Sequence, residues 1–234
     1  MNASASKAPS PAVKIRAAIM AAFGARGLGL SNLWLLESYR ARRKWALRSD
    51  SEFIHAVLAE IDPRIVTIDL APEPVVVRVL ENDHQTTFDA IIEFVDGHRE
   101  CREIKTDPDD DLDTRSQIQK EAQAVAARKM DAQYVRMYGT QMIQNPQRFW
   151  NGVRILRFVN AAKTYPLEQY RESIATRLQH SRCELTLLEL CAPFEPTFRP
   201  LVAAAAMQLF LDRHIALDVD LRPFNEHSPL RWAQ

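Results

Sequence analysis

The segment FDAIIEFVDGHRECREIK, residues 88–105, combines the alternation of a β-hairpin with side chains that do chemistry. Asp89 lies at the start of the first expected strand, and Glu103 and Lys105 lie at the end of the second. Two adjacent carboxylates suit Mg²⁺ or Mn²⁺, which prefer oxygen ligands. Such an ion lowers the pKa of a bound water, and a neighbouring lysine orients the nucleophile or stabilises charge on a phosphate. The alternative is a cross-strand salt bridge between Lys105 and the acids.

The turn of this hairpin decides which residues face each other. Asp96-Gly97 is a turn signal. A two-residue turn would place Glu93 opposite Glu100, whereas a three-residue turn over 95–97 with a left-handed glycine pairs Glu93 with Arg99. Opposite-charge cross-strand pairs contribute about 0.2–1 kcal/mol, and like charges are unfavourable. We therefore expect the three-residue turn.

The three-residue turn has a direct consequence for the acids. It places Asp89 opposite Glu103, and Lys105, two residues further along, shares their face. The other face is apolar and is expected to meet a core; it consists of Phe88, Ala90, Ile92 and Phe94. The hairpin is therefore predicted to present two carboxylates and an ammonium together.

Hydrophobic spacing predicts the elements around the hairpin. A helix over 51–61, with Asp50 or Ser51 as N-cap, is expected to end at Asp62-Pro63. Further elements are expected as strands over 64–70, 74–80 and 133–138 and as a helix over 112–130. The second half reads as helices over 147–163, 166–180, 184–191 and 196–212, followed by an extended piece over 214–224. Helices closed by a small strand pair suggest a winged-helix-like domain.

Composition and charge limit the class of protein. The chain has 234 residues, 47% hydrophobic and 26% charged, as in a folded globular protein. There is no apolar run of 18 residues, so no membrane span is expected. Three cysteines without a CxxC motif favour a reducing interior and a cytoplasmic location. The net charge is +7 over residues 1–50, −12 over 51–113 and +5 over the remainder, which suits an acidic cation site flanked by surfaces for polyanions.

The order of these motifs resembles the TnsA family of transposition endonucleases, within the PD-(D/E)xK nucleases. The resemblance covers roughly residues 45–140. It rests on the motifs Ser51-Glu52, Asp62-Pro63 with Ile65, Ala71-Pro72, Thr87-Phe88-Asp89 and Glu103-Ile104-Lys105. Phe88 stands where the family usually has proline, and Ala71 where it often has glutamine.

The resemblance implies a fold and an activity. The fold would be α/β: a restriction-endonuclease-like mixed sheet flanked by helices over 45–145 and a helical winged-helix-like domain over 146–234. Independently of the resemblance, charge predicts a basic N-terminal arm or helix over 1–44, and hydrophobic spacing predicts a helix at 12–23. The activity would be Mg²⁺-dependent (or Mn²⁺-dependent) cleavage of the 5′ ends of a transposon. Partners would be a DDE-type transposase and an AAA+ regulator.

The resemblance also assigns residues to roles. Asp89 and Glu103 would hold the metal, Glu52 would complete its site, and Lys105 would act in catalysis. Glu52 also suits simple charge complementation of a helix N-terminus. The candidate DNA contacts are the basic cluster Arg40, Arg42, Arg43 and Lys44, which is otherwise a solvated helix face, and the glutamines Gln119 and Gln123.

Two other functions remain open at this point. A stand-alone restriction, repair or junction-resolving nuclease would cut without a transposase. A non-catalytic DNA-binding adaptor would bind DNA equally well with or without metal. No histidine pair has a metal-ligand spacing, and no placed Cys–His pair or G-x-S-x-G motif suggests another chemistry.

Overall fold

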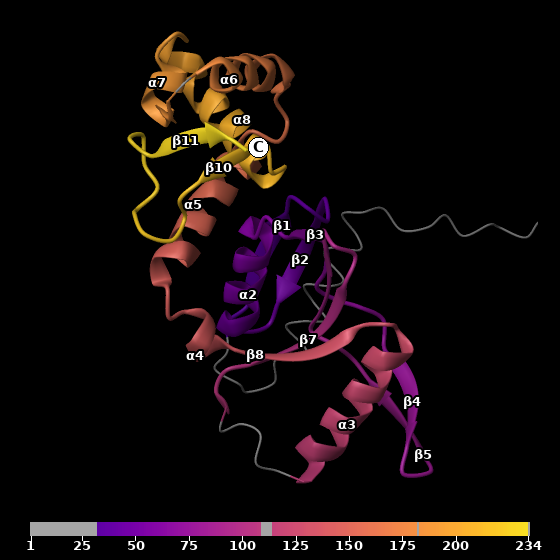
Figure 1. The fold of residues 1–234 in the computed structure, drawn as a ribbon. Helices are drawn as coiled ribbons and strands as arrows, with labels where there is room; N and C mark the ends of the chain where they lie inside the picture. Colours follow the sequence, from indigo (N-terminus) through magenta and orange to yellow (C-terminus); the bar gives the residue numbers. More distant parts are fainter. Residues whose placement is uncertain (1–31, 109–113, 182, 234) are drawn as a thin grey trace, which may run out of the picture.

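The computed structural model describes residues 32–108, 114–181 and 183–233. The expected helix over 12–23 lies outside these residues. The fold is mixed α/β (Figure 1). In chain order the elements are β1 (Trp34–Ser38), β2 (Arg43–Leu47), α2 (Asp50–Ile61), β3 (Ile65–Asp69), β4 (Val75–Val79), β5 (Asn82–Thr86), β6 (Ala90–Phe94), β7 (Arg99–Lys105), α3 (Thr114–Lys129), β8 (Gln133–Tyr138), α4 (Gly139–Met142), α5 (Pro146–Ala161), α6 (Glu168–His180), β9 (Leu185–Thr186), α7 (Leu187–Cys191), η2 (Pro196–Phe198), α8 (Arg199–Leu211), β10 (Ile215–Leu217) and β11 (Pro229–Trp232).

A four-stranded mixed sheet positions the predicted acids. Its strand order is β3-β6-β7-β8, with β7 and β8 parallel and the other pairs antiparallel. Alternate residues of a strand point to opposite faces. Ala90 and Ile92 of β6 share a buried cluster with Ala59 of α2, while Cys101 of β7 packs with Ala122 of α3. The predicted mixed sheet flanked by helices is therefore confirmed.

The predicted hairpin register is also confirmed. Ile91 pairs with Cys101 and Glu93 with Arg99, as the three-residue turn requires. Gly97 has φ +86°, the left-handed conformation that glycine adopts at little cost. Its N–H donates to the carbonyl of Phe94 at 3.0 Å. The turn residues and the charge pairing were sufficient to predict this register.

The basic cluster lies in a second hairpin, which the sequence did not predict. β1 and β2 pair antiparallel from Trp34↔Leu47 to Ser38↔Arg43. Arg42 adopts φ 50° in the turn, and Trp45 and Leu47 are buried. Residues 40–44 therefore form a turn and the first residues of β2 and not a helix face. The expected boundary at residue 44 falls inside β2.

A third hairpin, β4–β5, was missed as well. Leu80 and Glu81 form its two-residue turn, with φ 48° and 67°. Both values are left-handed, the conformation of a type I′ turn. This turn usually contains asparagine or glycine, so Leu80-Glu81 is a weak signal in the sequence.

α2 begins one residue earlier than predicted. Its N-cap is Ser49, whose hydroxyl accepts the N–H of Glu52 at 3.1 Å, and neither Asp50 nor Ser51 has this role. The helix ends at Ile61, with Asp62 as its C-cap before Pro63, as expected. On its inner face, the guanidinium of Arg102 donates to Nε2 of His55 at 3.0 Å, which fastens α2 against β7. Burial, together with the charge of Arg102, lowers the pKa of His55 to about 3, so the imidazole stays neutral and accepts this bond.

The C-terminal half contains the predicted helices with one change. The expected helix over 184–191 begins only at Leu187, because Leu185 and Thr186 form β9 and Thr186 caps α7 through a capping box with Glu189. Of the predicted extended piece over 214–224, residues 215–217 form β10. β10, β11 and β9 form a three-stranded sheet in that order.

One buried core connects the two halves of the chain. Val57 and Ile61 of α2 belong to the same cluster as Ile155 of α5 and Met207 of α8. α5 runs from beside α2 to the group of α6, α7 and α8 (Figure 1). At Gly152, α5 approaches α2 closely, since a Cβ added to Gly152 would lie 2.7 Å from Cγ1 of Val57.

Two further sequence expectations concern thiols and membranes. Cys101, Cys183 and Cys191 are all free. Within the described ranges, no helix has both the length and the apolar character needed to cross a bilayer.

Candidate metal and active site

The backbone before β6 brings Asp89 beside the end of β7, the strand that carries Glu103. Asp89 directly precedes β6, and its N–H donates to the carbonyl of Arg102 at 3.0 Å. Its carboxylate accepts the N–H of Ile104 at 2.7 Å. The backbone of β7 thus holds both the main chain and the side chain of Asp89 beside the residues that precede and follow Glu103.

Glu103 is a buried carboxylate surrounded by donors. Oε1 lies 3.0 Å from Nζ of Lys105, and Oε2 lies 2.8 Å from Nη2 of Arg136. The hydroxyl of Tyr134 donates to Oε2 at 2.6 Å. Burial alone would raise the pKa of Glu103, but the hydrogen bonds from Tyr134 and Lys105 and the positive charges of Lys105 and Arg136 lower it below its usual value. Glu103 is therefore held ionised.

The pKa of Asp89 is shifted in the opposite direction from that of Glu103. Burial raises its pKa, the hydrogen bond from Ile104 opposes this, and the carboxylates of Glu52 and Glu103 raise the pKa further, to about 6 against the usual 3.8. The charge of Lys105 acts in the lowering direction. Negative charge from three carboxylates thus meets around Asp89 without full compensation, and a bound cation would relieve it.

The charge of Glu52 on α2 acts on Asp89, but the carboxylate of Glu52 forms its hydrogen bonds at the N-terminus of its own helix. One carboxylate oxygen accepts the N–H of Arg48 at 2.9 Å, and the other accepts the hydroxyl of Ser49 at 3.3 Å. Among the described residues, no group of three or more His, Cys, Asp or Glu side chains is arranged to hold a metal ion. In this arrangement Glu52 is engaged at the start of α2, where its charge also complements the helix N-terminus, and its role in a metal site stays a prediction.

Two side chains on β8 complete the surroundings of Glu103 and were missed in the sequence. In the parallel register of β7 and β8, Glu103 pairs with Arg136 and Cys101 with Tyr134. The alternation in QYVRMY places Tyr134 and Arg136 on one face. Nothing local indicated that this face meets Glu103, because the register joins strands that are separated by α3.

The two glutamines of α3 have different environments. Gln123 is 1% exposed; its amide donates to the carbonyl of Thr87 at 3.1 Å and its oxygen lies 2.9 Å from the hydroxyl of Tyr134. As a correction, Gln123 supports the site from inside and is not placed to contact DNA. Gln119 lies on the exposed surface of the helix, and its contact with DNA stays a prediction.

The basic cluster likewise contains one side chain engaged in the fold and three exposed ones. The guanidinium of Arg40 donates to the carbonyls of Glu60 and Asp62, both at 2.9 Å, at the C-terminal end of α2. Arg40 is therefore engaged in the fold, which corrects its assignment as a phosphate contact. The other three side chains are exposed and remain candidates; they are Arg42, Arg43, which lies over the ring of Trp45, and Lys44.

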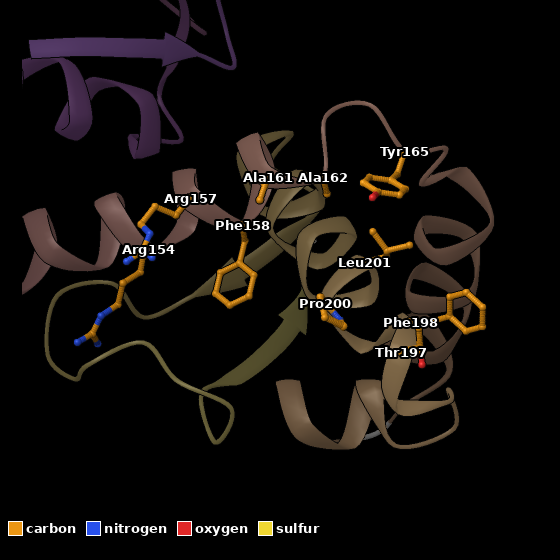
Figure 2. A pocket seen from close by; sticks show the side chains of 10 residues that line it. All are labelled: Arg154, Arg157, Phe158, Ala161, Ala162, Tyr165, Thr197, Phe198, Pro200 and Leu201. Atoms are coloured by element: carbon orange, nitrogen blue, oxygen red, sulfur yellow. The ribbon is translucent and has the colours of Figure 1, made fainter.

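A sizeable apolar cavity lies away from these acids. It has a volume of about 690 Å³ between α5 and the start of α8, and Figure 2 shows its aromatic and basic lining. No candidate site residue lines it. Its lining includes Arg154, Arg157, Phe158, Tyr165, Phe198 and Leu201.

The comparisons with known proteins assign no family to the chain. No family model matches the sequence, and no curated protein matches it significantly.

Proposed function

We propose that this chain is a metal-dependent DNA endonuclease of the PD-(D/E)xK class, and specifically a TnsA-like protein that cuts the 5′ ends of a transposon. One observation carries the proposal. A hairpin of the predicted register holds the carboxylate of Asp89 on the N–H of Ile104, next to Glu103, and Nζ of Lys105 lies 3.0 Å from Oε1 of Glu103. This order of residues is the one on which the resemblance rests.

The residues present fit a magnesium ion anchored by two carboxylates. Mg²⁺ usually keeps several waters and binds one or two carboxylates together with substrate phosphates. Asp89 and Glu103 would hold it, and the raised pKa of Asp89 supports a site short of positive charge. Glu52 would assist only after it releases the N–H of Arg48.

The roles of the protein groups follow from their surroundings. A bound Mg²⁺ supplies activation of water and neutralisation of charge on the phosphate. Asp89 is fixed by the N–H of Ile104, so its orientation does not have to be established when substrate binds. The side chain of Lys105 is 30% exposed, so its ammonium is accessible to the scissile phosphate or to the attacking water.

We also propose that the C-terminal part, from α6 to β11, is a winged-helix-like unit. Its element order is helix, strand, helix, short 3-10 helix, helix, strand, strand, and its sheet order β10-β11-β9 supports that proposal. In DNA-binding members of the helix-turn-helix class, the second helix of the motif enters the major groove. Here the corresponding helix, α8, is buried over most of Val202–Leu211 in the core of the chain, so α8 is not available to read DNA.

The proposed partners are DNA, a DDE-type transposase and an AAA+ regulator, in the cytoplasm. Exposed Arg42, Arg43 and Lys44 on the turn and start of β2 are the proposed phosphate contacts. The apolar cavity between α5 and α8 is the proposed protein-contact region (Figure 2). Arg157 on its rim makes no ion pair with another described residue, so an acidic partner segment would complement it.

The test is a cleavage assay with labelled transposon-end DNA and Mg²⁺ or Mn²⁺, with and without the transposase. Wild type is compared with Asp89→Ala and Lys105→Ala. Asp96→Ala is a matched control, because Asp96 is an exposed acid at the turn of the same hairpin. Metal-dependent cutting that is lost in the first two variants and kept in the control is expected.

The remaining functions give different results in this assay. Cutting of branched DNA by the chain alone, without the transposase, would indicate a stand-alone junction-resolving nuclease. DNA binding that is unchanged by metal and by Asp89→Ala, with no cutting under any condition, would indicate an adaptor. In that case the acids and Lys105 would form a structural salt bridge.

A further inference from the structure

The two oxygens of Glu103 have unequal surroundings. Oε2 is held by the hydroxyl of Tyr134 at 2.6 Å and by Arg136 at 2.8 Å, whose side chain is 8% exposed. Oε1 has the ammonium of Lys105 at 3.0 Å, and the side chain of Lys105 is 30% exposed. Oε2 is thus held by two groups from inside the protein, while Oε1 contacts the partly exposed ammonium of Lys105.

The hydrogen bonds around Tyr134 show what orients its hydroxyl. Nε of Arg136 donates to the hydroxyl oxygen at 2.7 Å, which leaves the phenolic proton to be donated elsewhere. Two acceptors are near, Oε2 of Glu103 at 2.6 Å and Oε1 of Gln123 at 2.9 Å. The bond to the ionised carboxylate is the shorter and stronger, so the hydroxyl of Tyr134 donates its hydrogen bond to Oε2 of Glu103.

We propose that Tyr134 is a positioning residue of the metal site: its hydroxyl, oriented by Arg136, fixes Oε2 of Glu103 and presents Oε1 on the side of Lys105 for a metal ion. This inference rests on the proposed function and adds a residue to it. Hydrogen bonds that orient a ligating carboxylate lower the cost of organising the site, and their loss typically reduces metal affinity 10–100-fold.

The experiment measures Mn²⁺ binding without DNA, from the electron paramagnetic resonance signal of free Mn²⁺. Tyr134→Phe removes one hydroxyl and leaves every charge in place. Its Mn²⁺ dissociation constant is expected to rise by about 10–100-fold over wild type. In the cleavage assay, the Mn²⁺ concentration for half-maximal rate is expected to rise by the same factor.

A second tyrosine provides a matched control. The hydroxyl of Tyr39 donates to the carboxylate of Asp212 at 3.0 Å, away from the acids of the hairpin. Tyr39→Phe therefore removes the same kind of hydrogen bond and is expected to leave Mn²⁺ affinity unchanged. Thermal unfolding of both variants separates loss of stability from loss of metal affinity, because a purely structural role would move only the unfolding temperature.

Each result decides one statement. Wild type that binds Mn²⁺, with Tyr134→Phe binding it within twofold, would overturn the positioning role and leave the proposed function intact. Wild type that binds no Mn²⁺ and cuts no DNA would overturn the proposed function, and this inference with it. If Tyr134→Phe does not fold, Arg136→Lys takes its place, because lysine keeps the charge but lacks the Nε that orients the hydroxyl. A tenfold rise in the Mn²⁺ dissociation constant would then support the positioning role, and a change below twofold would overturn it.

Discussion

Replacing Asp89 by asparagine is expected to stabilise the fold while it removes activity. Burial, with the nearby carboxylates of Glu52 and Glu103, raises the pKa of Asp89 to about 6, against 3.8 in the unfolded chain. This difference corresponds to about 3 kcal/mol of unfavourable free energy when Asp89 is ionised in the folded state. Asparagine keeps an oxygen that accepts the N–H of Ile104 but carries no charge.

The sign of the pH dependence follows from which state binds the proton. Between pH 3.8 and about 6, folded Asp89 retains a proton that the unfolded chain has released. The free energy of unfolding of wild type therefore falls as pH rises through this window, and the loss is complete above it. Asp89→Asn has no such loss, so its advantage grows to at most about 3 kcal/mol at pH 7 and vanishes below pH 4.

Urea unfolding at several pH values between 4.5 and 7.5, with a chelator present, measures this difference. Asp96→Asn at the exposed turn is the control and is expected to change the free energy of unfolding by less than about 0.5 kcal/mol. Added Mg²⁺ is expected to stabilise wild type and not Asp89→Asn. An Asp89→Asn variant that is less stable than wild type at pH 7, or a difference that does not change with pH, would refute the reasoning.

Substitutions at three further positions test the packing, the turn and the buried charges. Gly152→Ala is expected to lower the free energy of unfolding in urea by up to about 2 kcal/mol, because overpacking against Val57 exceeds the gain in helix propensity. An increase in stability would contradict the close approach of α2 and α5. Gly97→Ala is expected to cost about 1–2 kcal/mol at φ +86°, with Gly97→Asn costing less, and equal stability of all three proteins would contradict the left-handed turn. Glu103→Gln removes the buried carboxylate that pairs with Arg136 and is expected to cost about 3–5 kcal/mol and to abolish Mn²⁺ binding. A fully stable variant that still binds Mn²⁺ would show that Glu103 is not a ligand.

The hairpin and the long helices could be predicted from the sequence because their determinants are local. The left-handed Gly97 and the pairing of Glu93 with Arg99 both lie within a few residues of the turn, and together they set the register from Ala90 onward. The same reasoning failed for β1–β2 and β4–β5. There the turns contain Arg42 or Leu80 at positive φ, residues that carry no turn signal in the sequence.

The partners of the candidate residues were less accessible to sequence reasoning. Arg40 and Gln123 look like exposed polar residues in the sequence, yet one binds the carbonyls at the end of α2 and the other lies buried beside Tyr134. Whether a polar side chain faces solvent or fills a hydrogen-bonding position depends on which distant element packs over it. The periodicity of its own segment does not contain that information.

The chain's local pattern was enough to predict the register of the hairpin that carries Glu103 and Lys105 and is preceded by Asp89, because strand alternation and turn geometry act over short distances. Only the tertiary structure decided how Glu103 is held, because Tyr134 and Arg136 reach it through a parallel pairing of β7 with β8 across the intervening helix. Parallel pairing always needs a long crossover, so its register is set by the packing of helix against sheet.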